Sequence, residues 1–114
     1  MKYSFHPSAR EEFIEAIDYF EECRPGLVLE FSKEVFSTVQ RIVHFPLAWS
    51  EFSKHTRRCL TNRFPFGVIY QTVDEEIIII AVMQMNREPG YWKKRVKQKG
   101  PTRWPAPTKS FPLP

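Results

Sequence analysis

The sequence predicts an α+β domain in which an antiparallel helical hairpin packs on an antiparallel sheet of three to four strands. A short β-forming segment opens the chain, and two amphipathic helical patterns follow with only a short break between them. Three β-rich segments come next, again with short breaks. With 114 residues, of which 42% are hydrophobic, the chain can bury one core but not two.

The first two elements are a strand and a helix. Residues 1–5 are rich in β-formers and end at His6-Pro7, which favours a strand there. Ser8 and Glu11 have the spacing of a capping box, so we expect the helix to begin at Ser8. One apolar stripe at helical spacing follows, made of Ala9, Phe13, Ala16, Ile17 and Phe20.

A second helix follows almost at once. The segment Cys23-Arg24-Pro25-Gly26 ends the first helix, since proline lacks a donor and glycine tolerates turn geometry. The next helical pattern begins at Leu27 and ends at residues 44–46. It carries apolar residues on two sides, more than one sheet can cover, which predicts that a partner segment covers part of the hairpin.

The second half of the chain predicts a meander. The β-rich segments are Arg57–Phe64, Gly67–Val73 and Ile77–Met85, and the breaks between them are too short for crossovers. Residues 47–56 lack a period and are expected to form a loop. Residues 89–92, Pro-Gly-Tyr-Trp, are expected to begin a short last helix or turn.

Charge divides the chain unevenly. The formal net charge is +4, and residues 97–114 hold four basic residues and no acid, so residues 1–96 are neutral. Residues 8–34 are acidic, whereas residues 54–63 and 87–95 are basic. This separation of charge suits an anionic partner that binds at the basic region. A basic face that is simply solvated would have the same composition.

The sequence also predicts boundaries and location. Residues 1–96 form the expected domain, and the Pro-rich residues 97–114 are expected to be a disordered tail. No apolar run approaches the ~20 residues of a membrane span, and no signal-peptide core opens the chain. Together with two distant cysteines, Cys23 and Cys59, these features predict a cytoplasmic protein without a membrane partner.

Few residues offer chemistry. The three histidines are scattered and there is no glycine-rich phosphate loop, so we predict neither a metal site nor a cofactor. What remains is a basic and aromatic set with Arg57, Arg58 and Arg87 near Tyr91 and Trp92. These residues could hold phosphates and stack on bases, or they could protect a sheet edge and cover the core.

The order of elements and three strings resemble the RelE/ParE superfamily of type II toxins, which includes plasmid stabilisation proteins. The strings are FHPSAREEFIEAIDYFEE, RRCLTNRFPFGVIYQT and IIIIAVMQMNREPGYWKKR, and the resemblance covers residues 3–95. It implies a toxin that arrests bacterial growth and is held inactive by a cognate antitoxin in a hetero-oligomer. The antitoxin would wrap the hairpin and the sheet, with Phe13, Phe20, Phe31 and Phe36 as candidate contacts.

Two activities occur on the fold that this resemblance implies. RelE-type members cleave mRNA on the ribosome, and Arg58, Arg87 and Tyr91 fall on or near their catalytic positions. Leu60 and Gly67, however, stand where RelE has cations. Losing two of about four cations removes a few kcal/mol of transition-state stabilisation each.

The resemblance therefore favours inhibition of DNA gyrase by protein binding, with an mRNA endonuclease as the alternative, so whether the protein is an enzyme stays open. A non-toxic nucleic-acid-binding module is a third hypothesis. The candidate residues for binding the target or nucleic acid are Arg57, Arg63, Trp92, Lys93 and Arg95.

Overall fold

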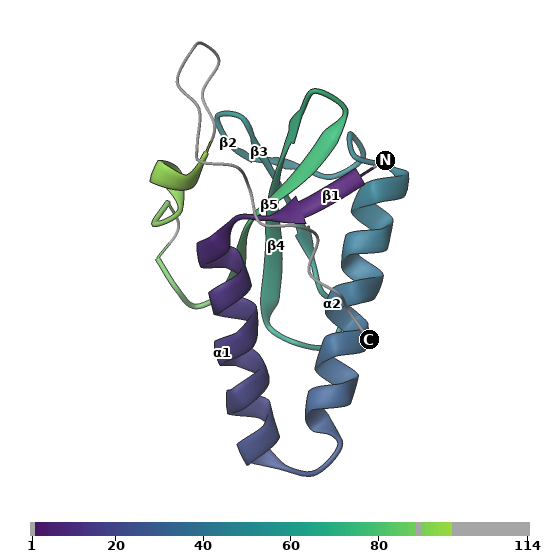
Figure 1. Cartoon of the computed structure of the whole chain (residues 1–114), viewed down its shortest axis with the longest axis vertical. Helices are drawn as coiled ribbons and strands as arrows, with labels where there is room; N and C mark the ends of the chain where they lie inside the picture. Colours follow the sequence, from purple (N-terminus) through teal and green to yellow (C-terminus); the bar gives the residue numbers. More distant parts are fainter. Residues whose placement is uncertain (1, 89, 97–114) are drawn as a thin grey trace.

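A five-stranded mixed sheet with two helices on one face forms the domain (Figure 1). The structure is a computed structural model that describes residues 2–88 and 90–96. Its elements in chain order are β1 (Lys2–Phe5), α1 (Pro7–Cys23), α2 (Leu27–His44), β2 (Glu51–Ser53), β3 (Thr56–Leu60), β4 (Phe66–Val73), β5 (Glu76–Gln84) and the 3₁₀ turn η1 (Lys93–Arg95).

The sheet order is β1-β5-β4-β3-β2. The α+β class, the helical hairpin and the β3–β5 meander are confirmed. The expectation of a wholly antiparallel sheet of three to four strands is wrong, because β1 pairs parallel to β5. Local patterns show only how neighbouring strands join. The parallel pair is formed by strands at opposite ends of the domain, with both helices lying between them in the chain.

A fifth strand, β2, lies in the segment expected to be a loop. It has only three residues and pairs with β3 through an irregular register. A strand of this length is too short to show an alternating apolar and polar pattern, so the sequence did not predict it. At the other end of β3, the predicted strand runs too far: β3 ends at Leu60, and the Thr61 hydroxyl donates to the backbone carbonyls of Phe64 and Phe66 in a turn.

Both helices occupy the predicted segments, but α1 is capped differently. His6 is its N-cap, with Nδ1 accepting from the Ser8 backbone N–H at 3.1 Å, and Pro7 is the first helical residue. The expected Ser8 capping box is therefore wrong, since proline in the first helical position places the start one residue earlier. Helix α2 follows Gly26, whose φ of 84° suits glycine, and ends at His44 as predicted.

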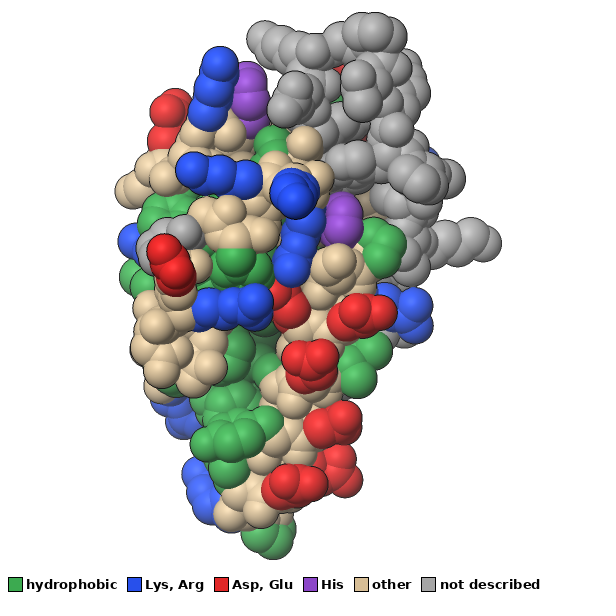
Figure 2. Space-filling model, turned by 90° about the vertical axis from the view of Figure 1, so that its left-hand side faces the viewer, with side chains coloured by type: hydrophobic (Ala, Val, Ile, Leu, Met, Phe, Trp, Pro, Cys, Tyr) green, Lys and Arg blue, Asp and Glu red, His purple; other side chains and the backbone are tan. Residues whose placement is uncertain are grey.

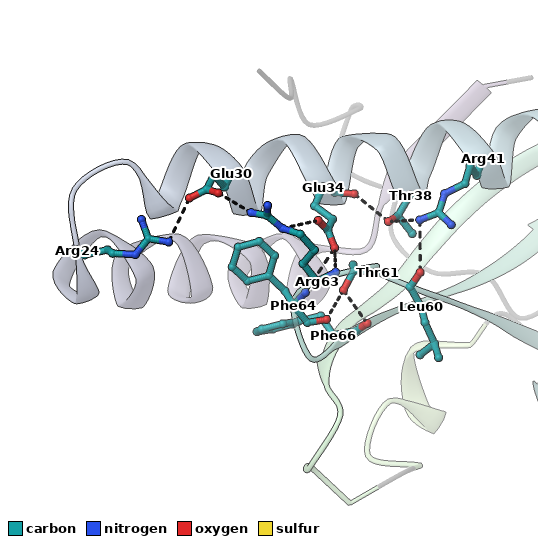
Figure 3. A network of polar contacts seen from close by, with 10 residues as sticks. All are labelled: Arg24, Glu30, Glu34, Thr38, Arg41, Leu60, Thr61, Arg63, Phe64 and Phe66. Carbon is teal, nitrogen blue, oxygen red and sulfur yellow. Dashed lines mark hydrogen bonds and ion pairs between the residues drawn. The ribbon is translucent and has the colours of Figure 1, made fainter.

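Helix α2 is fastened to the β3–β4 turn by polar contacts (Figure 3). Glu30 pairs with Arg24 and Arg63, and the Glu34 carboxylate accepts from the Arg63 backbone N–H. Further along the helix, Arg41 donates to the Thr38 hydroxyl and to the Leu60 carbonyl. These contacts hold α2 against the end of β3 and the turn that follows it.

The sheet buries apolar residues on both faces. The helix side holds the larger cluster, which includes Phe5, Phe13, Phe31 and Ile79. A smaller cluster on the opposite side centres on Trp92 and is covered by residues 91–96. The predicted short C-terminal helix is not found there. Among the described residues that follow β5, the structure has the 3₁₀ turn η1, and Trp92 and Val96 on either side of it pack against the sheet.

Some predictions lie outside the described residues. Pro89 and the tail at 97–114 are among them, so the boundary between domain and tail stays a prediction. Within the described part of the chain, neither helix combines the length and apolarity of a membrane span.

Candidate functional site

The edge of β5 that β1 leaves unpaired is the first feature of the site. Strand β1 covers β5 only up to the pair Phe5–Ile79, and a bulge at Ile80 interrupts the pairing with β4. Two backbone groups beyond this point are met by side chains. The Val82 N–H donates to Glu12 Oε1 at 3.1 Å, and the Ile80 carbonyl accepts from Arg95 Nη1 at 3.2 Å. Side chains thus take the place of a neighbouring strand here.

Glu12 on α1 holds two arginines beside this edge. Its side chain is 12% exposed. Arg95 Nη1 lies 2.9 Å from Oε1, and Arg87 Nη1 lies 3.6 Å from Oε2. Arg95 is itself largely buried, so this pair is shielded from water, whereas Arg87 is half-exposed. The single carboxylate therefore balances one of the two arginine charges beside it, and Arg95 is its closer partner.

Tyr91 lies between the two arginines. The Cζ atoms of Arg87 and Arg95 are 3.7 Å and 5.1 Å from the centre of its ring. Its hydroxyl is buried beside the Glu12 carboxylate. Burial raises the pKa of this hydroxyl above its usual range, and its polar contact with Glu12 and the negative charge of that carboxylate raise the pKa further. Tyr91 is therefore fully protonated at neutral pH.

An arginine–aromatic ladder, made of Arg58, Phe52, Trp92, Tyr91 and Arg87, continues across the sheet. Phe52 stacks on Trp92 with ring centres 5.2 Å apart, and Tyr91 meets Trp92 edge-on at 5.4 Å. Arg58 Cζ lies 4.0 Å from the centre of the Phe52 ring at one end, and Arg87 lies over Tyr91 at the other. Both guanidinium groups are thus held by aromatic rings.

Gly67 makes room for this ladder. A Cβ atom at residue 67 would lie 3.2 Å from Arg58 Cδ and 3.3 Å from Met85 Sδ. A side chain at this position would be tight against Arg58 and Met85, which would have to shift slightly. The resemblance identified Gly67 as a missing cation, and the structure shows that its empty space is filled by the aliphatic part of Arg58.

The structure separates the predicted target-binding residues. Arg57 lies away from the ladder, where it donates to the Trp49 carbonyl at 2.7 Å and pairs with Glu51. Arg63 is bound to Glu30 and Glu34 on α2. Trp92 is 1% exposed and lies inside the ladder, while Lys93 stands exposed on η1.

A groove lies between α1, the turn that precedes β4 and the end of β5. Its volume is about 440 Å³. Its apolar lining is formed by Ala16, Phe20, Pro65, Phe66 and Val82, with Tyr19, Glu15 and Arg87 among the residues around it. Figure 2 shows Lys and Arg side chains above on this side of the molecule and acidic side chains along its lower part.

Three of the four candidate antitoxin contacts are buried in the isolated chain. Phe13 and Phe31 are fully buried, and Phe20 is 9% exposed, at the wall of the groove. Phe36 is half-buried on α2. Helical spacing identifies an apolar stripe but does not show which part of it the sheet covers.

Sequence reasoning missed Glu12 and Phe52. Glu12 was one of many acids on a solvated helix face, and Phe52 lay in the expected loop; no local signal marks either. In the described residues, no three His, Cys, Asp or Glu side chains gather as metal ligands would.

Comparison with known proteins identifies the family. Residues 3–89 match the family of the ParE toxin of the type II toxin–antitoxin system parDE. Two relatives, Toxin ParE2 from Mycobacterium tuberculosis strains CDC 1551 / Oshkosh and ATCC 25618 / H37Rv, are each 28% identical over 85 residues, which cover 74% of this chain and 81% of the relative.

The fold is shared with a solved chain of the chromosomal ParDE TA system from P. aeruginosa. The TM-score is 0.61 at 14% sequence identity, and the match covers 75% of this chain and 97% of that chain. The family match itself extends from β1 through β5 and includes Glu12, Arg58 and Arg87. This chain therefore belongs to the ParE toxin family of type II toxin–antitoxin systems.

Proposed function

We propose that this ParE-family toxin arrests growth by binding DNA gyrase as a protein inhibitor, and that it does not cleave RNA. The observation that supports this most directly is the Glu12 carboxylate, which pairs with Arg87 and Arg95 beside the buried Tyr91 hydroxyl. Arg95 and Glu12 are thus engaged with each other within the protein, and Arg87 shares the same carboxylate.

RNA cleavage places three demands on a site. The 2′-hydroxyl must lose a proton, the phosphate needs cations, and the leaving oxygen needs a proton. A tyrosine with a raised pKa is a poor acid, and as a protonated phenol it is no base. Leu60 is 46% exposed and offers no charge, and Gly67 has no side chain and packs closely against the aliphatic part of Arg58.

The neutralising partner is, in this proposal, a cognate antitoxin whose segment fills the groove between α1 and β5. The groove joins an apolar lining to an exposed aromatic side chain, Tyr19, which is 62% exposed. Arg87 and Glu15 are among the residues that line it. An amphipathic segment with apolar residues toward Phe20 and an acidic residue toward Arg87 is complementary to this surface.

The test of mechanism compares two assays on the purified full chain. We expect it to block supercoiling by gyrase without ribosomes, and to leave mRNA intact in cells that express it. Tyr91→Phe should change inhibition less than threefold, whereas a lost catalytic group typically lowers the rate about 10²-fold or more. Ribosome-dependent mRNA cuts that disappear in Arg58→Ala would establish the endonuclease instead.

The test of the groove uses two exposed residues on the hairpin. Tyr19→Asp puts a charge into the groove, and Leu29→Asp puts one on a part of α2 that does not line it. Only Tyr19→Asp should weaken neutralisation by the antitoxin, by about tenfold or more. Equal antitoxin affinity for both variants would place the antitoxin elsewhere.

A further inference from the structure

The cations on the two basic segments are not equally available. Arg57, Arg63 and Arg95 are each paired with carboxylates. In the described part of the chain, no carboxylate forms an ion pair with Arg58, Lys93 or Lys94, and Arg87 is paired only at 3.6 Å while half-exposed. Arg58 and Arg87 at the two ends of the ladder, with Lys93 and Lys94 on the turn η1 that follows Trp92, make up what we term the ladder face.

The ladder holds its arginines in place. Arg58 lies over Phe52 at 4.0 Å and Arg87 over Tyr91 at 3.7 Å, and the two rings are joined through Trp92. A guanidinium that rests on an aromatic ring keeps its N–H groups free for paired hydrogen bonds to phosphate oxygens. Because the side chains are already ordered, binding costs less conformational entropy.

The ladder face lacks the apolar anchors of a protein interface. Trp92 is 1% exposed, Tyr91 and Phe52 are half-buried, and Leu60 is the large apolar residue that stands exposed on β3 nearby. Protein interfaces draw their affinity mainly from aromatic and aliphatic residues that become buried at the centre. Glu88 is an exposed acid close to these cations in the sequence. Cations without a carboxylate partner on a rigid base still fit a polyanion better than they fit an apolar protein partner.

From these observations we infer that the ladder face binds the phosphodiester backbone of duplex DNA. The inference rests on the proposed gyrase function, because gyrase presents DNA beside its own protein surface. The toxin then contacts DNA phosphates through Arg58, Arg87, Lys93 and Lys94 while the rest of its surface meets the enzyme.

The experiment measures binding of the full chain to a labelled duplex by fluorescence anisotropy over a series of salt concentrations, without gyrase. The double variant Lys93→Gln/Lys94→Gln should bind about tenfold more weakly at low salt, and equally so for any DNA sequence. The slope of log affinity against log salt concentration should fall by the equivalent of about two phosphate contacts. The matched control is Lys2→Gln/Lys33→Gln, which removes two exposed lysines from β1 and α2. All variants keep the basic residues of the tail.

Equal loss of DNA affinity in the double variant and the control would overturn the inference, and so would affinity that does not depend on salt. A double variant that binds DNA normally but binds gyrase without DNA more weakly would show that the face meets protein instead. The two proposals fail separately: DNA binding without inhibition of supercoiling contradicts the gyrase function, and inhibition with unchanged DNA affinity contradicts this inference.

Discussion

The two faces of the sheet are covered in different ways. On the helix side, two long helices bring a dense aromatic core in which Phe31 touches Phe13, Phe20, Phe64 and Phe66. On the opposite side, a short segment covers the sheet with one buried tryptophan, and a single carboxylate holds that segment to α1. The packing of the helices on the sheet is stabilised by many contacts. The packing of the segment on the opposite face depends on a few residues, which also form the candidate site.

The largest effect should come from Trp92→Ala. Removing a fully buried indole leaves a cavity against Ile80 and Phe52, and such truncations cost about 3–5 kcal/mol. The measurement is the free energy of unfolding in urea. Leu47→Ala, at a residue 73% exposed, should change it by less than about 0.5 kcal/mol. A small loss in Trp92→Ala would show that the segment contributes little to the fold.

A somewhat smaller effect is expected for Glu12→Ala. It leaves Arg95 buried beside the unpaired Val82 N–H, and breaking a shielded ion pair in this way costs about 3 kcal/mol. Glu12→Gln keeps an acceptor for both donors and should lose less. Glu15→Ala, one turn along the same helix and exposed, is the control and should be near neutral. Similar losses in Glu12→Ala and Glu15→Ala would mean that the carboxylate does not hold the segment.

The smallest effect concerns His6, at the junction between β1 and α1. Burial lowers the pKa of His6, the positive charge of Arg95 lowers it further, and the Glu12 carboxylate opposes them. The unfolded chain therefore takes up the proton first, and stability should be full above pH ~6.5 and should fall as the pH decreases below it.

A matched pair of variants tests this. His6→Ala removes the cap at every pH, at about 1 kcal/mol, whereas His6→Asn keeps a side-chain acceptor and should flatten the decrease in the free energy of unfolding between pH 6.5 and 5. An equally steep decrease in His6→Asn would assign the pH dependence to another group.

The sequence alone determined the helical hairpin, the meander and the family. Each rests on residues close together in the chain: the apolar stripe of α1, the stop at residues 23–26 and the β-forming runs between turns all act within a few residues. The strings that indicated the superfamily, read together with the order of the elements, are likewise local patterns.

Only the tertiary structure decided what surrounds the site. The Val82 N–H reaches Glu12 across 70 positions of sequence, and Arg95 reaches it across 83. β1 pairs with β5 because the folded hairpin brings the two ends of the domain together, and no local sequence pattern predicts this pairing. The same holds for Phe13 and Phe31, whose burial depends on which side of each helix meets the sheet. Local preferences are fixed by neighbours in the chain, but ion pairs, strand partners and exposure are fixed by residues that only folding brings near.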